Sequence, residues 1–394
     1  MPQQSIGGRW LHPVDEFKSL AEPGQPDGRP ARRIPYTGSG GRRRALKVAG
    51  LVSGLSADGI DAVLAEIEQG QDGRIHAQTL NSRWSPHTMP VRRRILQPPA
   101  SAAELACLNW ELGVSFGDAA LSVMGGRGRA DLLGSHGQTV CHLPEQGVSL
   151  QLGEPAAIAE RSGVPVIANF RSADLAAGGH GGPVAPFADW HLLSHERENR
   201  ACLNLGSIAS VTVLPAGGGL QDLLAFDVGP ANLLIDACGG DQGGSAALLG
   251  RVDQELLGEL LEHPFFSRRP PKSCGREEFG DVLLEKASAR ELPRPDLMAT
   301  LVALTAETVR RALAGHRVDR LLVSGGGVYN RAMVRELGRR FKVLPTDAFG
   351  IGARAKEALS FAVLAFAAWR RIPAGLPAVT GARHASVLGQ TCWP

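Results

Sequence analysis

The segment from Val164 to Val184 combines an apolar run, a guanidinium, a carboxylate and a glycine-rich loop. The apolar run is typical of a strand and ends at Asn169; Arg171, Asp174 and four glycines follow it. In open α/β sheets, ligands bind just beyond the carboxyl ends of the strands. Glycine lets the backbone approach a ligand closely there, so Asp174 is a candidate general base. The alternative is that this carboxylate caps a turn or a short helix.

Three other glycine-rich turns follow expected strands, at residues 54–59, at Gly206 and at residues 325–327. Without side chains in the way, backbone N–H groups can converge on an anion. Each turn alone is also explained as a tight turn, but three of them, two in hairpins, favour a nucleotide-phosphate site. The turns lack the Gly-Lys-Ser/Thr sequence of a P-loop. The predicted nucleotide-binding residues are Gly54, Leu55, Ser56, Ala57, Asp58, Gly59, Ile60, Asp61, Gly206, Gly325, Gly326 and Gly327.

Carboxylates accompany these turns. Asp58 and Asp61 cannot bind phosphate directly, and a carboxylate in such a hairpin normally serves Mg²⁺ through water. Asp227 follows another apolar run and could also face the metal or the phosphate. We therefore predict Asp58 and Asp227 as metal-side residues. The alternatives are an ordinary Asp-Gly hairpin turn for Asp58 and a strand-to-helix cap for Asp227.

Strands and helices alternate along the chain, which indicates an α/β fold. The segments 46–67 and 201–214 both have a strand, a glycine-containing turn and a second strand, which predicts two halves built on the same plan. We expect a first lobe at 46–200, to which a C-terminal segment from about 376 to 394 can return, and a second lobe at 201–375. The expected strands are 46–51, 60–67, 132–133, 164–168, 201–205, 208–214 and 320–324; the expected helices are 102–121, 155–162, 297–314, about 330–340 and 353 to about 369.

Composition narrows the class of protein. The chain has 394 residues, with 42 basic against 39 acidic residues, a balance that argues against nucleic acid or membrane surfaces as partners. The six cysteines show no Cys-x-x-Cys spacing, so we expect reduced thiols in a cytoplasmic protein. Residues 1–45 are rich in Pro, Gly and Arg and are expected to form a disordered extension.

Several motifs occur in the order of one known family. They are Ser53–Asp61, Gly134–Thr139, Leu150–Pro155, the Asp174 loop, Phe226–Asn232, Pro270–Glu278, Ser324–Gly327, Thr346–Asp347, Lys356–Leu359 and Leu376–Gly381. From residue 46 to the C-terminus, the chain resembles the anhydro-N-acetylmuramic acid kinases, bacterial enzymes of cell-wall (peptidoglycan) sugar recycling. The resemblance implies a two-lobed actin-like (ribonuclease H-like) kinase, a homodimer, with ATP and Mg²⁺ in the interdomain cleft.

The resemblance also implies the reaction. The substrate of the family is 1,6-anhydro-N-acetylmuramic acid, and ring opening is coupled to phosphorylation of O6, giving N-acetylmuramic acid 6-phosphate. Asp174 would activate the water that attacks the anomeric carbon. His136, Gln138, Arg171 and Glu357 would lie on the sugar side; their ordinary alternatives are loop packing, local ion pairing and an exposed helix position.

The chain departs from the family pattern at several turns. Leu55 stands where the family has Thr, and Ser207 stands where it has Gly; Val228, Ala231, His180 and Cys274 are further replacements. These changes keep two alternatives open. One is a kinase for another 1,6-anhydro sugar such as levoglucosan, and the other is a catalytically weakened nucleotide- or sugar-binding homologue.

Overall fold

Two β-sheets form the framework of the chain in a computed structural model, which describes residues 44–394. Almost all of the extension expected at 1–45 lies outside the described residues. The first sheet contains β1 (Leu46–Ser53), β2 (Gly59–Gln69), β3 (Ile75–Pro86), β4 (Leu132–Leu143), β5 (Val148–Leu152), β6 (Val166–Ala168) and β12 (Gln390–Cys392). The second contains β7 (Arg200–Leu205), β8 (Ile208–Leu214), β9 (Leu224–Pro230), β10 (Arg320–Ser324) and β11 (Val343–Pro345).

The two sheets share one strand order. In the first, β1 pairs antiparallel with β2 and β2 with β3, while β1, β4 and β6 run parallel. In the second, β7 pairs antiparallel with β8 and β8 with β9, while β7, β10 and β11 run parallel. Each half is thus a hairpin meander extended by parallel strands. This repeat confirms the predicted α/β class and the prediction of two halves built on the same plan.

Helices cover the sheets, and the five that the sequence predicts begin within three residues of their expected starts. Helix α3 begins after Ser101, whose hydroxyl accepts from the Glu104 N–H at 3.2 Å, because an N-cap oxygen satisfies an otherwise unpaired amide. The helices are α2 (Met89–Leu96), α3 (Ala102–Met124), α4 (Pro155–Ser162), α5 (Ser172–Ala176), α6 (Pro186–Leu193), α7 (Asn232–Ala237), α8 (Gln254–Leu261), α9 (Gly280–Ala289), α10 (Arg294–Ala312), α11 (Arg331–Gly338), α12 (Lys356–Trp369) and α13 (Pro377–Thr380).

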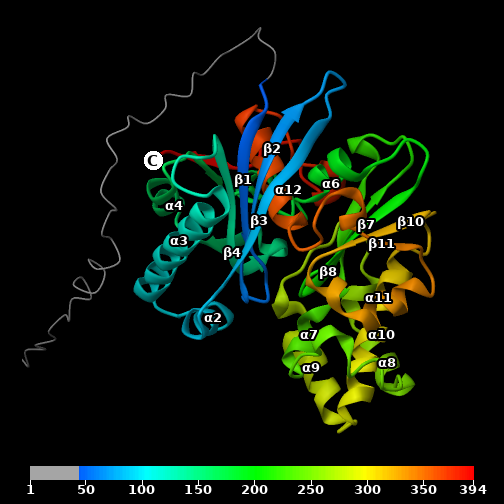
Figure 1. The fold of residues 1–394 in the computed structure, drawn as a ribbon. Coiled ribbons are helices and arrows are strands. Elements are labelled where there is room, and N and C mark those ends of the chain that lie inside the picture. Colours follow the sequence, from blue (N-terminus) through cyan, green and yellow to red (C-terminus); the bar gives the residue numbers. More distant parts are fainter. Residues whose placement is uncertain (1–43) are drawn as a thin grey trace, which may run out of the picture. The chain divides into compact units, whose positions relative to one another are not determined.

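Strand β1 is buried on both faces. Val48 and Val52 belong to one hydrophobic cluster, with α12, whereas Ala49 and Leu51 belong to another, with α3. The alternation follows from the two-residue period of a strand. Helices α3 and α12 therefore cover opposite faces of the first sheet (Figure 1).

The position of α12 differs from the expectation, which placed residues 353–369 in the second lobe. In the structure α12 contacts β1, β2 and β4 of the first sheet. The approach is close, since a Cβ at Gly50 would lie 1.9 Å from the Ala358 carbonyl oxygen and one at Gly134 would lie 2.3 Å from that of Phe361. An apolar helix with no polar face carries no signal of which sheet it packs on. The C-terminal strand β12 also joins the first sheet, antiparallel to β6.

The motif Gly134–Thr139 lies beyond the expected strand at 132–133, but in the structure it is inside strand β4. Its two glycines have structural reasons to be there. Gly134 lies under α12, and Gly137 has a φ of +76° beside the point where the pairing of β4 with β1 shifts register. None of the helices among residues 44–394 is long and apolar enough to span a membrane.

Candidate active site

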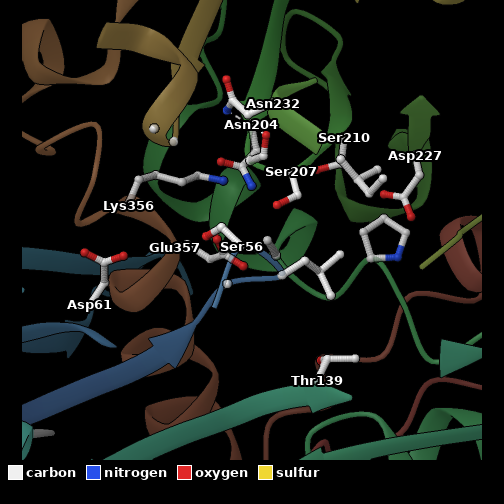
Figure 2. A pocket seen from close by; sticks show the side chains of 18 of the residues that line it. Ser56, Asp61, Thr139, Asn204, Ser207, Ser210, Asp227, Asn232, Lys356 and Glu357 are labelled. Atoms are coloured by element: carbon white, nitrogen blue, oxygen red, sulfur yellow. Dashed lines mark hydrogen bonds between the residues drawn. The ribbon is translucent and has the colours of Figure 1, made fainter. Parts of the chain in front are cut away.

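A cavity of about 550 Å³ is lined by residues from both sheets and from α12. Figure 2 shows Ser56 and Thr139 from the first sheet facing Ser207 and Asp227 from the second. The amino-terminal end of α12 contributes Lys356 and Glu357 to the same space. The turns that the sequence singled out for phosphate binding, after β1, β7 and β10, thus open onto one cavity.

The first turn, between β1 and β2, is held in a strained conformation. Ala57 has a φ of 51° and its N–H donates to the Gly54 carbonyl at 3.0 Å. A left-handed residue other than glycine costs free energy that the surroundings must offset. Gly59 cannot be replaced freely either, because a Cβ there would lie 2.3 Å from the Ser85 carbonyl oxygen of β3. Gly54, Leu55, Ser56, Asp58 and Asp61 line the cavity, whereas Ala57, Gly59 and Ile60 support the turn from behind.

Arg354, just before α12, binds two carboxylates, that of Asp58 in this turn and that of Asp61 at the start of β2. Its Nε donates to Asp61 Oδ1 at 2.7 Å, and its Nη2 lies 3.5 Å from Asp58 Oδ2. Burial raises the pKa of Asp61 to about 6, although the Arg354 hydrogen bond and charge oppose the rise. Asp58 also accepts from the Ser56 hydroxyl at 2.8 Å.

The turn between β7 and β8 and the turn after β10 lie against each other. Gly325 has a φ of +82°, and a Cβ there would lie 2.7 Å from Asn204 Oδ1, so the position requires glycine. A Cβ at Gly327 would lie 2.6 Å from the Leu205 side chain. Gly206, Gly325 and Gly326 line the cavity and Gly327 does not.

Arg171 and His136 form a pair on the wall of the cavity. Arg171 donates from Nε to His136 Nε2 at 3.1 Å and from Nη1 to the Gly181 carbonyl at 2.8 Å. The His136 ring stacks on Phe361 of α12, with 4.5 Å between ring centroids. Both side chains line the cavity, as does Glu357.

Gln138 is placed differently from the other predicted sugar-side residues. It is fully buried and does not line the cavity. Its amide accepts from the Ser53 hydroxyl at 2.5 Å and donates to the Gly54 carbonyl at 3.1 Å. The structure therefore places Gln138 behind the first turn, where it fixes the backbone of Gly54.

Asp174 lies on the short helix α5 and is 1% exposed, outside the lining of the cavity. The Gly181 N–H donates to its Oδ2 at 2.8 Å, and the Thr380 hydroxyl donates to its Oδ1 at 2.7 Å. These bonds fix the carboxylate between the glycine-rich loop and α13.

Two further carboxylates face the cavity. Asp227 lies within β9, not at a strand-to-helix cap, and its Oδ2 accepts from the Cys274 N–H at 2.9 Å. Burial raises the pKa of Asp227 to about 6, against the effects of the Cys274 hydrogen bond and the charges of Arg171 and Lys272. Burial also raises the pKa of Glu357, against the charges of Lys356 and Arg171 and a hydrogen bond with Asn204.

No group of three or more His, Cys, Asp or Glu side chains within residues 44–394 is arranged to hold a metal ion. Mg²⁺ in kinases is usually bound by one or two carboxylates together with substrate phosphates and water. Asp58, which is half exposed and lines the cavity, fits that kind of site. Asp227 lines the cavity on the opposite sheet.

Four residues of this site were not predicted from the sequence. Arg354 precedes a helix without any motif, and Thr380 lies far along the chain from its partner Asp174. Lys356 forms a buried ion pair with Asp189 of α6, and Asp189 also accepts from the Thr212 hydroxyl at 2.7 Å. Lys356 and Thr380 lie in two of the motifs noted in the sequence, but only the fold pairs them with Asp189 and Asp174.

Comparison with known proteins shows which protein family contains this chain. The family model for anhydro-N-acetylmuramic acid kinase matches residues 46–394. The chain belongs to the anhydro-N-acetylmuramic acid kinase family. It is 42% identical to the enzyme of that name from Salinibacter ruber, with 90% of this chain and 98% of the relative covered. The relative from Bacillus cereus is 35% identical, with 89% and 100% covered.

This membership confirms the predicted family and the predicted enzyme class, a kinase. Among solved structures, the chain is similar to a 2-hydroxyisocaproyl-CoA dehydratase activator from Clostridium difficile with bound ADPNP, at 14% identity and a TM-score of 0.40, with 82% of this chain and 96% of that chain covered. A ROK family glucokinase from Streptomyces griseus is 12% identical with a TM-score of 0.38, and 81% and 99% are covered. These likenesses are too distant to inform on function.

Proposed function

We propose that the protein transfers the γ-phosphoryl group of ATP to O6 of 1,6-anhydro-N-acetylmuramic acid while water opens the anhydro ring. The product is N-acetylmuramic acid 6-phosphate, an intermediate of cell-wall amino-sugar recycling. Family membership over residues 46–394 supports the reaction. The observation that carries it structurally is that the hairpin turns of both sheets, at Gly54–Asp58 and Gly206–Ser207, line one cavity together with Arg171 and Glu357.

The phosphates of ATP fit between the two hairpin turns. Gly54 and Gly206 leave room for the backbone to approach phosphate oxygens. Ser56 and Ser207 offer hydroxyl donors at the same place. Asp58 and Asp227 would hold Mg²⁺, which neutralises phosphate charge and polarises the transferred group when it is bound. The segment 325–327 lies beside the second turn and would face the nucleoside.

On the sugar side, Arg171, His136 and Glu357 line the cavity; Arg171 and Glu357 present a cation and a carboxylate, and His136 Nε2 accepts from Arg171. Asp174 would accept a proton from water as the water oxygen bonds to the anomeric carbon. The bond from that carbon to O6 breaks, and O6 takes the γ-phosphoryl group as ADP leaves. Positioning both events in one cavity avoids releasing a free alkoxide. Because Asp174 is enclosed, we infer that the glycine-rich loop at 178–182 shifts when the sugar binds.

All six cysteines are free in the structure, which supports a reducing compartment and hence a cytoplasmic location. A homodimer, which the family resemblance implies, stays a prediction.

The experiment that tests the proposed function follows ADP release and sugar phosphate formation from ATP. Three parallel reactions contain 1,6-anhydro-N-acetylmuramic acid, levoglucosan or no sugar. We expect phosphate transfer to the muramic sugar and only background ADP release without sugar. Phosphorylation of levoglucosan but not of the muramic sugar would make levoglucosan the substrate and contradict the proposed one. A folded protein that binds ATP but phosphorylates neither sugar would contradict the proposal.

A further inference from the structure

Among residues 44–394, three arginine or lysine side chains line the active-site cavity: Arg171, Arg354 and Lys356. Two of them are engaged away from the phosphate turns. Arg171 binds His136 and the Gly181 carbonyl, and Lys356 is paired with Asp189. Arg354 instead binds Asp58 of the turn after β1 and Asp61 at the start of β2.

The Arg354 side chain is fixed but accessible. Its guanidinium carbon lies 4.4 Å from the centre of the Trp84 ring, and its Nε holds Asp61 at 2.7 Å. Stacking on an aromatic face leaves the edge of the guanidinium available for hydrogen bonds. The side chain remains 37% exposed. The planar guanidinium of Arg354 is thus held beside the turn with part of its surface exposed.

The charge balance of the turn requires a cation. Asp58 and Asp61 place two carboxylates beside a cavity that must accept a polyphosphate, which remains negative even when it carries one divalent cation. The carboxylates and the polyphosphate are all negative and repel one another unless a positive charge lies between them. The replaced residues Leu55 and Ser207, which also line the cavity, add no positive charge. Arg92 and Arg276 donate to the Ser56 and Leu55 carbonyls but do not line the cavity, whereas Arg354 both binds the carboxylates and lines it.

We propose that Arg354 is a polyphosphate-binding residue of this chain. In the nucleotide-free state it neutralises Asp58 and Asp61. When the nucleotide binds, the edge of its guanidinium contacts the β- and γ-phosphates while Nε keeps Asp61, and Asp58 becomes free to serve Mg²⁺. This inference rests on the proposed use of ATP by the same site.

The test compares nucleotides that share adenosine but differ in phosphate number. Affinities for AMP-PNP, the non-hydrolysable ATP analogue, and for AMP are measured calorimetrically, with and without Mg²⁺, for the wild type, Arg354→Ala and Arg354→Lys. Losing a charge-assisted contact predicts roughly a 10- to 100-fold weaker affinity for AMP-PNP in Arg354→Ala. The affinity for AMP should stay within about twofold, and Arg354→Lys should recover part of the loss, since a lysine keeps the charge without the fork.

Arg94→Ala is the matched control. Arg94 lies on α2, is 36% exposed and pairs with Glu111 at 2.5 Å, outside the lining of the cavity. The Arg94→Ala variant should bind AMP-PNP and AMP with the affinities of the wild type. If Arg354→Gln, a second uncharged variant, and Arg354→Ala both keep wild-type affinity for AMP-PNP, or lose AMP and AMP-PNP equally, the inference is overturned. A wild type that binds AMP-PNP through Arg354 but phosphorylates no sugar would overturn the proposed function and leave the inference standing.

Discussion

Arg171 donates its Nε hydrogen to Nε2 of His136 across 3.1 Å. Because a guanidinium only donates, Nε2 must be unprotonated. The ring is therefore neutral with its proton on Nδ1, which lies 3.3 Å from the Gly137 carbonyl oxygen. Burial and the charge of Arg171 both lower the pKa of His136. His136 thus orients Arg171 as a hydrogen-bond acceptor and is not an acid at neutral pH.

Replacing this acceptor should weaken sugar binding. His136→Phe keeps a ring against Phe361 but removes the partner of Arg171. A lost hydrogen bond to a charged group costs about 1.5–3 kcal/mol. We expect KM for the anhydro sugar to rise roughly 10-fold or more, with KM for ATP nearly unchanged. Steady-state kinetics measures both constants, and equal changes in the two would show that His136 does not act through the sugar side.

Thr380 should affect turnover through Asp174. Thr380→Val removes the hydroxyl that holds Asp174 Oδ1 at 2.7 Å, in a site where Thr380 is 2% exposed. We expect kcat to fall about 10-fold and the free energy of unfolding to fall by about 1–3 kcal/mol. Thr380→Ser, which keeps the hydroxyl, is the control and should retain most activity. Unaltered turnover in the valine variant would argue that the orientation of Asp174 does not matter.

The buried pair of Lys356 and Asp189 should contribute to stability asymmetrically. Lys356→Met leaves the Asp189 carboxylate buried without a counter-charge, which typically costs about 3–5 kcal/mol. Adding Asp189→Leu removes that charge, and we expect the double variant to regain more than half of the lost free energy of unfolding. Urea denaturation of the single and double variants measures this. A double variant as unstable as Lys356→Met would mean that packing, not charge, causes the loss.

The ionised Asp227 carboxylate should lower the free energy of unfolding at neutral pH, although phosphate transfer needs it. Its pKa in the folded protein is about 6, above the unfolded value of 3.8, so the folded state holds the proton longer. Stability from this group therefore declines as pH rises from about 4 to 6 and stays reduced above 6. Asp227→Asn should raise the free energy of unfolding by roughly 1–2 kcal/mol at pH 7.5, allowing for partial exposure. The gain should vanish near pH 4, and phosphate transfer should fall sharply.

Thermal melts of wild type and Asp227→Asn across pH 4–8 measure that difference. A stabilisation that does not depend on pH would show that the effect comes from packing or from the Cys274 hydrogen bond, not from the ionised carboxylate.

Local patterns were sufficient for seven of the twelve strands among residues 44–394, but not for β3, β5, β9, β11 and β12. The repeated hairpins, the Ser101 cap and the strand ending at Ala168 all carry short-range signals, and the structure has them. Strand β3 was missed because most of its residues are exposed and the alternate positions Ala77, Thr79 and Asn81 are only half-buried and partly polar. The partners of Asp174 and Asp61 were missed for a different reason. Thr380 and Arg354 meet their carboxylates across more than 200 residues of chain, a juxtaposition that only the packing of α12 and α13 creates.

The most direct test of the account is the rate of N-acetylmuramic acid 6-phosphate formation from ATP and the anhydro sugar by wild type and Asp174→Asn. Thermal melts and ATP binding confirm that both proteins are folded. The account predicts turnover by the wild type and a rate lower by about 10²–10⁴-fold in the variant, the usual contribution of a general base. Wild-type turnover in Asp174→Asn, or no product from a folded, ATP-binding wild type, would contradict it.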